Sequence, residues 1–386
     1  MKNQLASIEL RALVSELKQL EGSWVGQVYE LAAANSKKGG KEIVLQLGTS
    51  EGKRYLVCLA PSAMFSSKAR PATSEKPGGF CSLLRHHLGN AKIVSISQLG
   101  SERILELVFS PRNRQQLRLV VELFSKGNIL LVDEKSVIIG AAEHQSWKDR
   151  TIRPGFTYLP PPATADFASM SEEQLQKAVL SSEKDSVVKA LAVDLGLSGV
   201  YAEELCAVAE IDKSKSPSQL SQAELSSLFS SLQRLLSRKP QPLAILDGSN
   251  SPAEAFPFQT AASAAAKTLP FGSFNEAVEA VSLRQLDSSA LSSEKSFSTR
   301  KVRELEIAIA QQNATVAEME KVVKEATAAA ELIYTYYQEV RQILDDYNKL
   351  RKTFTPEQLR EYFSSSKIVK SIDEKTGTIT LEVSGQ

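Results

Sequence analysis

The chain has 386 residues, of which 42% are hydrophobic and 24% charged, a composition typical of folded soluble proteins and unlike that of disordered or membrane-spanning chains. Its net charge of +1 is divided unevenly, because residues 1–155 contain 22 Lys and Arg against 14 Asp and Glu (+8), which leaves 24 against 31 (−7) in the remainder. A basic first part favours a polyanion as its partner, although ordinary surface variation could produce the same excess.

The first expected element is an amphipathic helix that begins near Ser7 and ends at Gly22. Charged residues interrupt its apolar part and no small-residue cleavage site follows, so it does not resemble a signal peptide. Glu9 lies in the first turn, where the helix dipole favours a carboxylate. The apolar side chains recur at spacings of three and four, which is the pattern of a buried helix face: Leu10, Leu13, Val14, Leu17 and Leu20.

Strand-like and helical runs alternate over the next part of the chain. Met64–Gly79 reads as a loop, and a short helix at Phe80–Leu88 carries Arg85, His86 and His87 before Gly89 and Asn90 end it. Before that loop, three apolar or alternating runs predict strands at Trp24–Leu31, Lys41–Leu47 and Arg54–Leu59, with turns at Asn35–Gly40 and Ser50–Gly52.

Two more strands, Lys92–Gln98 and Glu102–Phe109, are joined by a tight turn at Gly100–Ser101. Glu102 and Arg103 therefore stand where the second strand leaves the turn, and a charged pair there can point at a partner. Further strands are predicted at Gln116–Phe124, Asn128–Val132 and Val137–Ala141. These short strands with two helices make an α+β first lobe, residues 1 to about 165.

Residues 170–238 read as helical and include an apolar–Gly–apolar hairpin at 195–205. Backbone N–H groups at the helix start of such a hairpin can hold phosphate. Gly196 and Gly199 could equally be there only to end a helix. A strand pair at Pro242–Gln259 and a helix at Ser273–Val281 follow.

The last long element is a heptad pattern over residues 302–347, which predicts a helix about 70 Å long. Its apolar seam must bury against another helix, so we expect it to pair with a second copy or to fray. A short helix at Thr355–Ser364 and a hairpin at Lys367–Val383 complete the chain. The seam positions alternate between a and d of the heptad: Val302, Leu305, Ile309, Gln312, Val316, Met319, Val323, Ala326, Ala330, Ile333, Tyr337, Val340, Leu344 and Tyr347.

Several stretches together resemble the NFACT-N domain family of RqcH and NEMF proteins, and its archaeal RqcH members in particular. They are FCSLLRHHL (80–88), GSERI (100–104), FSKGNILLVD (124–133), RPGFTYLPPP (153–162), AEELC with AEIDK (202–213), AELIYTYYQEVRQIL (330–344) and SIDEKTGTITLEV (371–383). The resemblance implies an NFACT-N lobe (1–165), a helix-hairpin-helix region with a connecting segment (166–290), a coiled-coil arm (291–352) and an arm tip (353–386). It also implies that a second arm and an NFACT-R domain are absent, so that the chain is an N-terminal fragment.

The resemblance further implies a cytoplasmic ribosome quality control factor. Family members bind large ribosomal subunits that carry peptidyl-tRNA and recruit an aminoacyl-tRNA, for which alanyl-tRNA is one candidate, so that the nascent chain gains a C-terminal tail without mRNA. Such a protein is an RNA-binding adaptor and not an enzyme, and it needs no cofactor. The resemblance marks Glu9, Glu102 and Arg103 as tRNA-binding, with glutamate here at both family aspartates. Further possible nucleic-acid contacts are Arg11, Arg85, His86, His87 and Arg153.

Two alternatives belong to other classes. A DNA-glycosylase-like protein would attack with an N-terminal proline and close with a zinc finger, whereas this chain starts Met1–Lys2–Asn3 and has three scattered cysteines, Cys58, Cys81 and Cys206. A DNA-glycosylase-like protein of this sequence would therefore bind nucleic acid without catalysis. A fibronectin-binding surface adhesin would need export, for which the sequence shows no signal peptide or anchor. With no P-loop, no GxSxG motif and three histidines, we expect neither a catalytic nor a metal site.

Overall fold

The computed structural model describes residues 4–31, 41–112, 114–162, 165–373 and 376–382, and for 289–301 it describes the backbone alone. The turn predicted at Asn35–Gly40 and the first part of the hairpin turn at 374–375 lie outside these ranges. The chain divides into two compact units, Met1–Lys295 and Ser296–Gln386. Each unit is described by itself.

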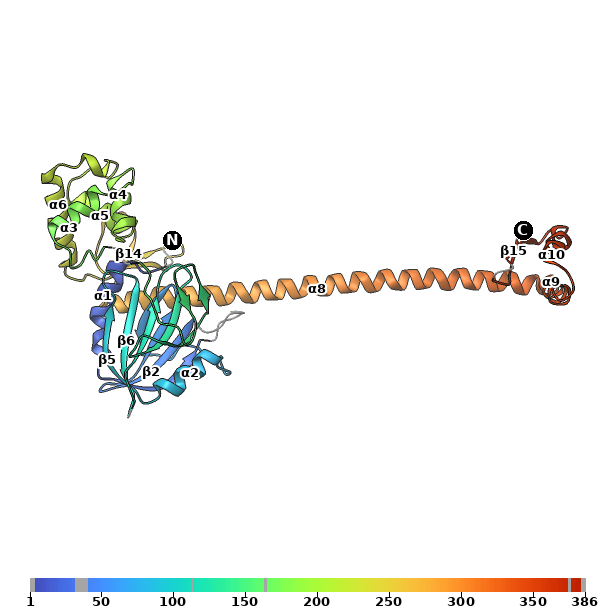
Figure 1. Ribbon diagram of the computed structural model, residues 1–386, viewed down its shortest axis with the longest axis horizontal. Coiled ribbons are helices and arrows are strands. Elements are labelled where there is room, and N and C mark those ends of the chain that lie inside the picture. Colours follow the sequence, from blue (N-terminus) through green and yellow to red (C-terminus); the bar gives the residue numbers. More distant parts are fainter. Residues whose placement is uncertain (1–3, 32–40, 113, 163–164, 374–375, 383–386) are drawn as a thin grey trace. The chain divides into compact units, whose positions relative to one another are not determined.

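The first unit contains a nine-stranded antiparallel sheet in the order β4-β3-β2-β1-β5-β6-β7-β8-β9 (Figure 1). The predicted α+β class is confirmed, but the sheet has more strands than expected. Its fourth strand, β4, occupies the start of the stretch predicted to be a loop, and all of its residues are buried. The strands are β1 (Trp24–Glu30), β2 (Glu42–Thr49), β3 (Gly52–Leu59), β4 (Ala63–Ser67), β5 (Lys92–Gln98), β6 (Ile104–Ser110), β7 (Leu117–Glu122), β8 (Asn128–Asp133) and β9 (Ile138–Ala141).

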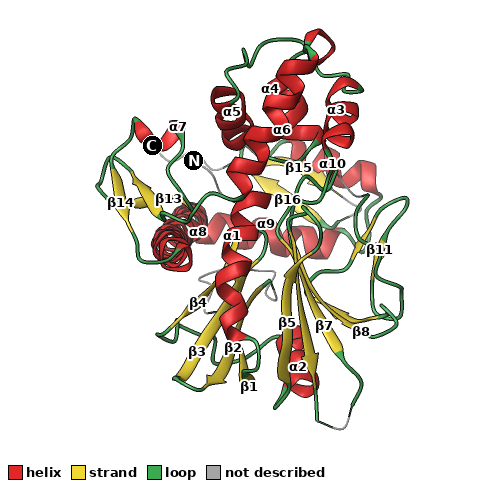
Figure 2. Cartoon of the chain, turned by 90° about the vertical axis from the view of Figure 1, so that its left-hand side faces the viewer, coloured by secondary structure: helices red, strands yellow, loops and turns green. Residues whose placement is uncertain are grey.

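The sheet consists of two halves that diverge, because β1 and β5 pair only at Trp24 and Lys92. Helix α1 (Ser7–Leu17), extended by a 3₁₀ turn (Lys18–Leu20), runs along the line where the halves part (Figure 2). Leu10, Leu13 and Leu17 are fully buried in a core that contains residues from both halves. The predicted apolar face of this helix therefore packs between the two halves of the sheet. The N-cap of the helix is Ala6.

Strands β6 to β8 are buried on both faces. Leu105 and Leu119 face the main core, whereas their neighbours Ile104 and Val120 belong to a second core. The chain after β9 covers that second core with a small hairpin, β10 (Gln145–Ser146) and β11 (Thr151–Ile152), and with Tyr158. Burial on both sides explains why these strands read as nearly continuous apolar runs.

A helical region with its own core follows the sheet, as predicted. It includes a π-helical turn at Ala190–Asp194, directly before the hairpin, and it takes in Ala6 and Ile8 from the start of α1. Its helices are α3 (Glu172–Leu180), α4 (Val187–Lys189), α5 (Gly199–Val208) and α6 (Gln222–Leu236), with a 3₁₀ turn at Pro217–Gln219. Helix α2 (Gly79–Leu88) lies at the opposite end of the strands (Figure 2).

A three-stranded sheet, β13-β12-β14, connects the helical region to the long helix α8 (Phe274–Thr335). Its strands are β12 (Leu243–Leu246), β13 (Pro252–Phe256) and β14 (Thr268–Pro270), with a short helix α7 (Ala261–Ala264) between the last two. The first two strands match the predicted pair. The third was missed, because its three residues are all exposed and show no alternation.

The first turns of α8 are part of the first unit. The Glu16 carboxylate accepts hydrogen bonds from the N–H groups of Phe274 (2.9 Å) and Asn275 (2.8 Å), which satisfies two helix-start donors. The Asn275 side chain bonds to both the N–H and the C=O of Ser66 on the edge strand β4, each at 2.7 Å. Phe274, Ala277, Val278 and Val281 then complete the main core.

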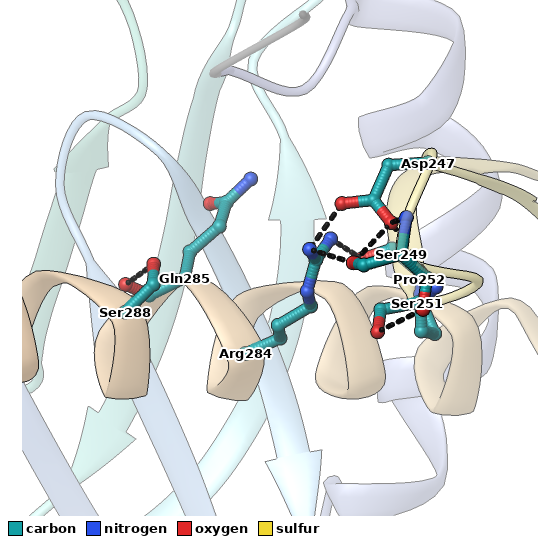
Figure 3. Close-up of polar contacts among 7 residues, drawn as sticks. All are labelled: Asp247, Ser249, Ser251, Pro252, Arg284, Gln285 and Ser288. Atoms are coloured by element: carbon teal, nitrogen blue, oxygen red, sulfur yellow. Dashed lines mark hydrogen bonds and ion pairs between the residues drawn. The ribbon is translucent and has the colours of Figure 1, made fainter.

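Arg284, on the third turn of α8, fastens this helix to the turn between β12 and β13 (Figure 3). Its guanidinium donates to the Pro252 carbonyl at 2.9 Å and forms an ion pair with Asp247. Asp247 also accepts from the N–H groups of Ser249 (2.9 Å) and Ser251 (3.2 Å). The start of the helix is thus held by an apolar face and by polar contacts on either side.

The second unit contains the remainder of α8, α9 (Tyr337–Leu350), α10 (Pro356–Ser364) and a hairpin of β15 (Val369–Asp373) and β16 (Thr378–Leu381). Its small core is formed by Tyr347, Leu359 and Phe363. Every side chain from 302 to 335 is exposed, so the heptad seam is uncovered there and the coiled coil remains a prediction. The helix is interrupted at Tyr336, which the sequence did not indicate. Among the described residues, no helix has the length and apolar character needed to cross a membrane.

Candidate functional site

Glu102 and Arg103 lie at the end of the turn that joins β5 to β6, where the sequence placed them. The turn needs a left-handed residue, and Gly100 supplies it with φ +53°. The Glu102 N–H donates to the Leu99 carbonyl at 3.0 Å, and the Arg103 carbonyl accepts from the N–H of Leu123 at 2.8 Å. Both side chains are half-buried.

Arg103 is held in place by a residue that sequence reasoning missed. Its Nη1 donates to Gln4 Oε1 at 2.9 Å, and Gln4 Nε2 donates in turn to the Ser125 carbonyl at 3.2 Å. Burial lowers the pKa of the Arg103 guanidinium, and the Glu102 carboxylate opposes that shift. An arginine remains charged at neutral pH even so. Arg103 is thus a fixed, half-buried cation.

A pocket of about 600 Å³ opens beside this pair. One wall is formed by the 101–103 turn and the start of α1, and the other by the hairpin that leads into α5. The lining residues are Gln4, Leu5, Ala6, Ser7, Ser101, Glu102, Arg103, Ala192, Val193, Gly196, Ser198, Gly199 and Val200. The structure therefore brings together Arg103 and the predicted hairpin, which lie far apart in the sequence.

The hairpin wall contains two residues in the left-handed region of the backbone. Gly196 and Ser198 both have positive φ, +72° and +71°, and Ser198 is the N-cap of α5. The Ser198 hydroxyl oxygen is buried and, among the described residues, has no hydrogen-bond partner. Exposed Val193 adds apolar surface at the rim. One pocket thus combines a guanidinium, a carboxylate, a helix N-terminus and an apolar rim.

Two further contacts that the sequence did not indicate hold the 101–103 turn in place. Ser101 Oγ donates to Asp166 Oδ1 at 2.5 Å, and Ser7 Oγ donates to the Ser101 carbonyl. Hydrogen bonds from Ser101 and Ser169 keep the pKa of Asp166 below its ordinary value, and Arg11 adds to this effect. Arg11 itself is exposed on α1 and does not line the pocket.

Glu9 has no exposed surface, contrary to the expectation of a side chain that contacts tRNA. Its carboxylate accepts from the Ala6 N–H at 2.8 Å and from the Tyr201 hydroxyl at 2.7 Å. Burial and the Glu9 charge raise the pKa of Tyr201 well above its ordinary value. In this structure Glu9 positions the two elements that form the pocket walls, α1 and α5.

Arg85, His86 and His87 lie on α2, which is at the other end of β5 from Glu102 and Arg103. That strand has 7 residues, which corresponds to about 20 Å. Arg85 Nε donates to the Val28 carbonyl at 2.7 Å, so this arginine attaches α2 to β1. His86 and His87 stack edge to face with their ring centroids 5.0 Å apart. Burial, His86 and Arg114 lower the pKa of His87.

The predicted nucleic-acid contacts therefore do not form one site. One group lies at the pocket and another on α2, and Arg153 belongs to neither. It is exposed, just after β11 on the segment that covers the second core.

All three cysteines, Cys58, Cys81 and Cys206, are buried. Within the described ranges, no three His, Cys, Asp or Glu side chains are grouped so that they could hold a metal ion.

Comparisons with known proteins give a consistent result. The family model described as NFACT N-terminal and middle domains matches residues 7–380. The archaeal Rqc2 homolog aRqcH of Methanocaldococcus jannaschii is 25% identical over 100% of this chain, which spans 59% of that protein. The Rqc2 homolog RqcH of Streptococcus suis is 34% identical over 45% of this chain and 34% of its own length. This chain thus spans well under two thirds of these relatives.

The fold also matches a solved structure, the N-terminal part of the fibronectin/fibrinogen-binding protein from Streptococcus suis. The TM-score is 0.57 at 24% identity, and the match covers 72% of this chain and 98% of the solved one. The family model extends from the first residue of α1 almost to the end of β16. Since nearly every element described above falls within that match, the chain belongs to the family of NFACT N-terminal and middle domains.

Proposed function

We propose that this chain is the tRNA-binding and ribosome-binding part of a cytoplasmic ribosome quality control factor. In this proposal it binds large ribosomal subunits that still carry peptidyl-tRNA and recruits an aminoacyl-tRNA, so that the nascent chain is extended without mRNA. Its relatives include a human protein named ribosome quality control complex subunit NEMF, which is 29% identical over 36% of this chain. Peptide-bond formation would take place in the ribosome, so the chain acts as an adaptor.

The pocket beside Glu102 and Arg103 is the observation that carries this proposal. The planar guanidinium of Arg103 suits a phosphate or a base edge, and it is already held by Gln4. Glu102 can accept a hydrogen bond from a base amino group or orient the arginine. The start of α5 offers N–H groups to a phosphate. Together the two walls would hold one part of a tRNA, with Glu9 and Tyr201 fixing the distance between them.

Replacing both charged residues with alanine tests the proposal. We expect the Glu102→Ala/Arg103→Ala variant of the full-length protein to recover little tRNA while it still sediments with peptidyl-tRNA-loaded large subunits. A matched control is Glu106→Ala/Arg118→Ala, which removes another acid–base pair of the same sheet (3.3 Å apart) that does not line the pocket. Normal tRNA recovery by a folded, subunit-bound Glu102→Ala/Arg103→Ala variant would disprove the assignment of these residues.

Binding to the subunit has its own test. Loaded subunits should be preferred to empty ones, and binding should weaken as salt is added, because contacts with phosphate release counterions. Equal sedimentation with loaded and empty subunits would contradict this part of the proposal.

A fibronectin-binding adhesin is the alternative, suggested by the description of the solved Streptococcus suis protein. At 24% identity that likeness establishes the fold alone. Cell fractionation separates the two functions, since an adhesin is found with the envelope and a rescue factor with large ribosomal subunits.

A further inference from the structure

The β10–β11 hairpin, on the face of the sheet that carries the second core, has an exposed tryptophan. Trp147 is 50% exposed. Its backbone N–H donates to the Arg150 carbonyl at 2.8 Å, which closes the turn between β10 and β11. Lys148 and Asp149 form the exposed tip of that turn. Tryptophan is a residue type enriched at binding surfaces, because its ring offers a large apolar contact area and a polar N–H group.

Arg150 fixes the tryptophan from one side. Its guanidinium lies over the Trp147 ring, 5.6 Å from the centroid, and 5.3 Å from the centroid of Tyr158. The same guanidinium forms an ion pair with Glu122, whose side chain is only 3% exposed, and its Nε donates to the Leu159 carbonyl at 2.6 Å. A cation anchored in this way lies over the indole, and half of the Trp147 surface remains exposed.

The segment that carries the indole contains exposed apolar and basic side chains. Phe156 and Leu159 are 52% and 53% exposed on the same segment. Between residues 145 and 159 the sequence has three cations, Lys148, Arg150 and Arg153, against the single carboxylate of Asp149. Lys148 and Arg153 are both exposed. Because Arg150 is paired with Glu122, the exposed charges of this segment are Lys148 and Arg153 against Asp149. This excess of positive charge on a segment with exposed apolar side chains favours a polyanion over an apolar protein helix as its partner.

The hairpin lies at the same end of the sheet as Arg103. Glu122, the partner of Arg150, is paired in the ladder with Ile104, the residue that follows Arg103. The next residue, Leu123, donates its N–H to the Arg103 carbonyl. Leu5, which lines the pocket, belongs to the main core, whereas Ile152 and Tyr158 of the hairpin segment belong to the second core. The hairpin and the pocket therefore lie at the same end of the strands, on opposite faces of the sheet.

We propose that Trp147 is a stacking platform for an unpaired base of a bound RNA, with the adjoining phosphates contacted by Lys148 and Arg153. Bases stack on exposed indole faces in single-strand binding sites, and basic side chains beside the ring follow the backbone. The inference rests on the proposed function in that the natural ligand would be the RNA bound at Arg103. It adds a second contact with that RNA, on the opposite face of the sheet from the pocket.

The chain contains two tryptophans, which makes a direct test possible. Trp24 is also 50% exposed, so it is a matched control for Trp147. In a Trp24→Phe variant of the whole chain Trp147 is the only tryptophan, and in a Trp147→Phe variant Trp24 is, so excitation selective for tryptophan reports on each residue separately. We expect a short single-stranded oligoadenylate to quench the emission of the first variant and to protect it from iodide, and to change the second little. Equal responses, or no response in either, would overturn the proposal.

Binding measurements distinguish base stacking from simple apolar contact. Trp147→Leu keeps apolar bulk without an aromatic face, and we expect it to weaken oligonucleotide binding by about fivefold to about 150-fold, whereas Trp147→Phe should weaken it less. If the leucine variant binds RNA as tightly as the unchanged chain, the patch is an apolar docking surface and the inference is wrong.

The same fluorescence assay separates this inference from the proposed function. Adding Glu102→Ala/Arg103→Ala to the Trp24→Phe variant should leave the quenching of Trp147 by the short oligonucleotide in place. Quenching without any effect of the double substitution on tRNA recruitment would support Trp147 and contradict the pocket. Loss of recruitment without quenching would do the reverse.

Discussion

The Tyr201 hydroxyl donates a 2.7 Å hydrogen bond to Glu9 Oε1, and this fully buried contact joins residues that are 192 positions apart. Glu9 lies in the first turn of α1 and Tyr201 in the first turn of α5. One wall of the pocket begins at each of these helix starts. This acid–phenol pair, which does not line the pocket, therefore helps to hold the two walls in place.

Tyr201→Phe removes the hydroxyl donor from a buried carboxylate. We expect it to lower the free energy of unfolding by about 1–3 kcal/mol, because it takes one donor away from a fully buried acceptor. Urea denaturation measures the loss. Tyr29→Phe is the control, since Tyr29 donates to the neutral Gln46 side chain at 3.1 Å in a half-buried site and should cost less. Equal costs would contradict the importance assigned to the Glu9 contact.

The contact between Asp247 and Arg284 predicts sensitivity to acid. Hydrogen bonds from Ser249 and from the Arg284 guanidinium hold the pKa of Asp247 well below its ordinary value. A carboxyl group with a lowered pKa stabilises the fold above its unfolded-state pKa, and this stabilisation is lost as the pH falls toward the folded-state value.

We therefore expect the advantage of the unchanged chain over Asp247→Asn, measured as a difference in thermal midpoint, to be constant near neutrality. It should shrink as the pH falls below about 4, the ordinary pKa of an aspartate. Asp149→Asn, at an exposed turn tip, is the control and should show no such difference. A difference between the unchanged chain and Asp247→Asn that does not change with pH would rule out the ion pair as its source.

The residues of α2 should separate into structural and surface groups. Arg85→Ala removes the bond to the Val28 carbonyl and should destabilise the first unit by about 0.5–1.5 kcal/mol or somewhat more. His86→Ala/His87→Ala should cost less than Arg85→Ala, since His86 is exposed and His87 only half-buried. If the two histidines contact RNA, the double variant should also show a shallower salt dependence of binding. Unchanged binding at every salt concentration would leave them without that function.

The uncovered seam of α8 predicts that the chain associates with a second copy or frays. Side chains such as Ile309, Met319 and Val323 are each more than half exposed, and a heptad seam is stable in water only when another helix covers it. Light scattering over a range of concentrations, with limited proteolysis, tests this. A strict monomer whose helix resists protease would contradict it.

The elements that the sequence predicted well are those with a local pattern. Strand β5 has the predicted bounds, Lys92–Gln98, because its β-branched residues stand between two local turn signals, Gly89–Asn90 and Gly100–Ser101. Strand β4 was missed because all five residues are buried, so no alternation marks it, and Ser66 and Ser67 read as loop residues. The Gly100–Ser101 turn was likewise visible in the sequence as a local signal.

The assembly of the site depends on long-range contacts that a single sequence does not reveal. The carboxylate of Glu9 at a helix start looks like a favourable dipole contact, and nothing near it indicates Tyr201 as a partner. Gln4 and Asp166 carry no motif, yet they hold Arg103 and Ser101. The separation of α2 from Arg103 could have been inferred, because the helix precedes β5 and the turn follows it.

The way in which α8 begins determines where the chain can be cut. A fragment that stopped at Pro270, after the last strand of the small sheet, would lose Phe274, Ala277 and Val278 from the main core. It would also leave the carboxylate of Glu16 and the edge of β4 at Ser66 without the partners that α8 supplies. An autonomously folding fragment that contains the pocket must therefore continue past Arg284, so its natural end falls inside a helix and not in a loop.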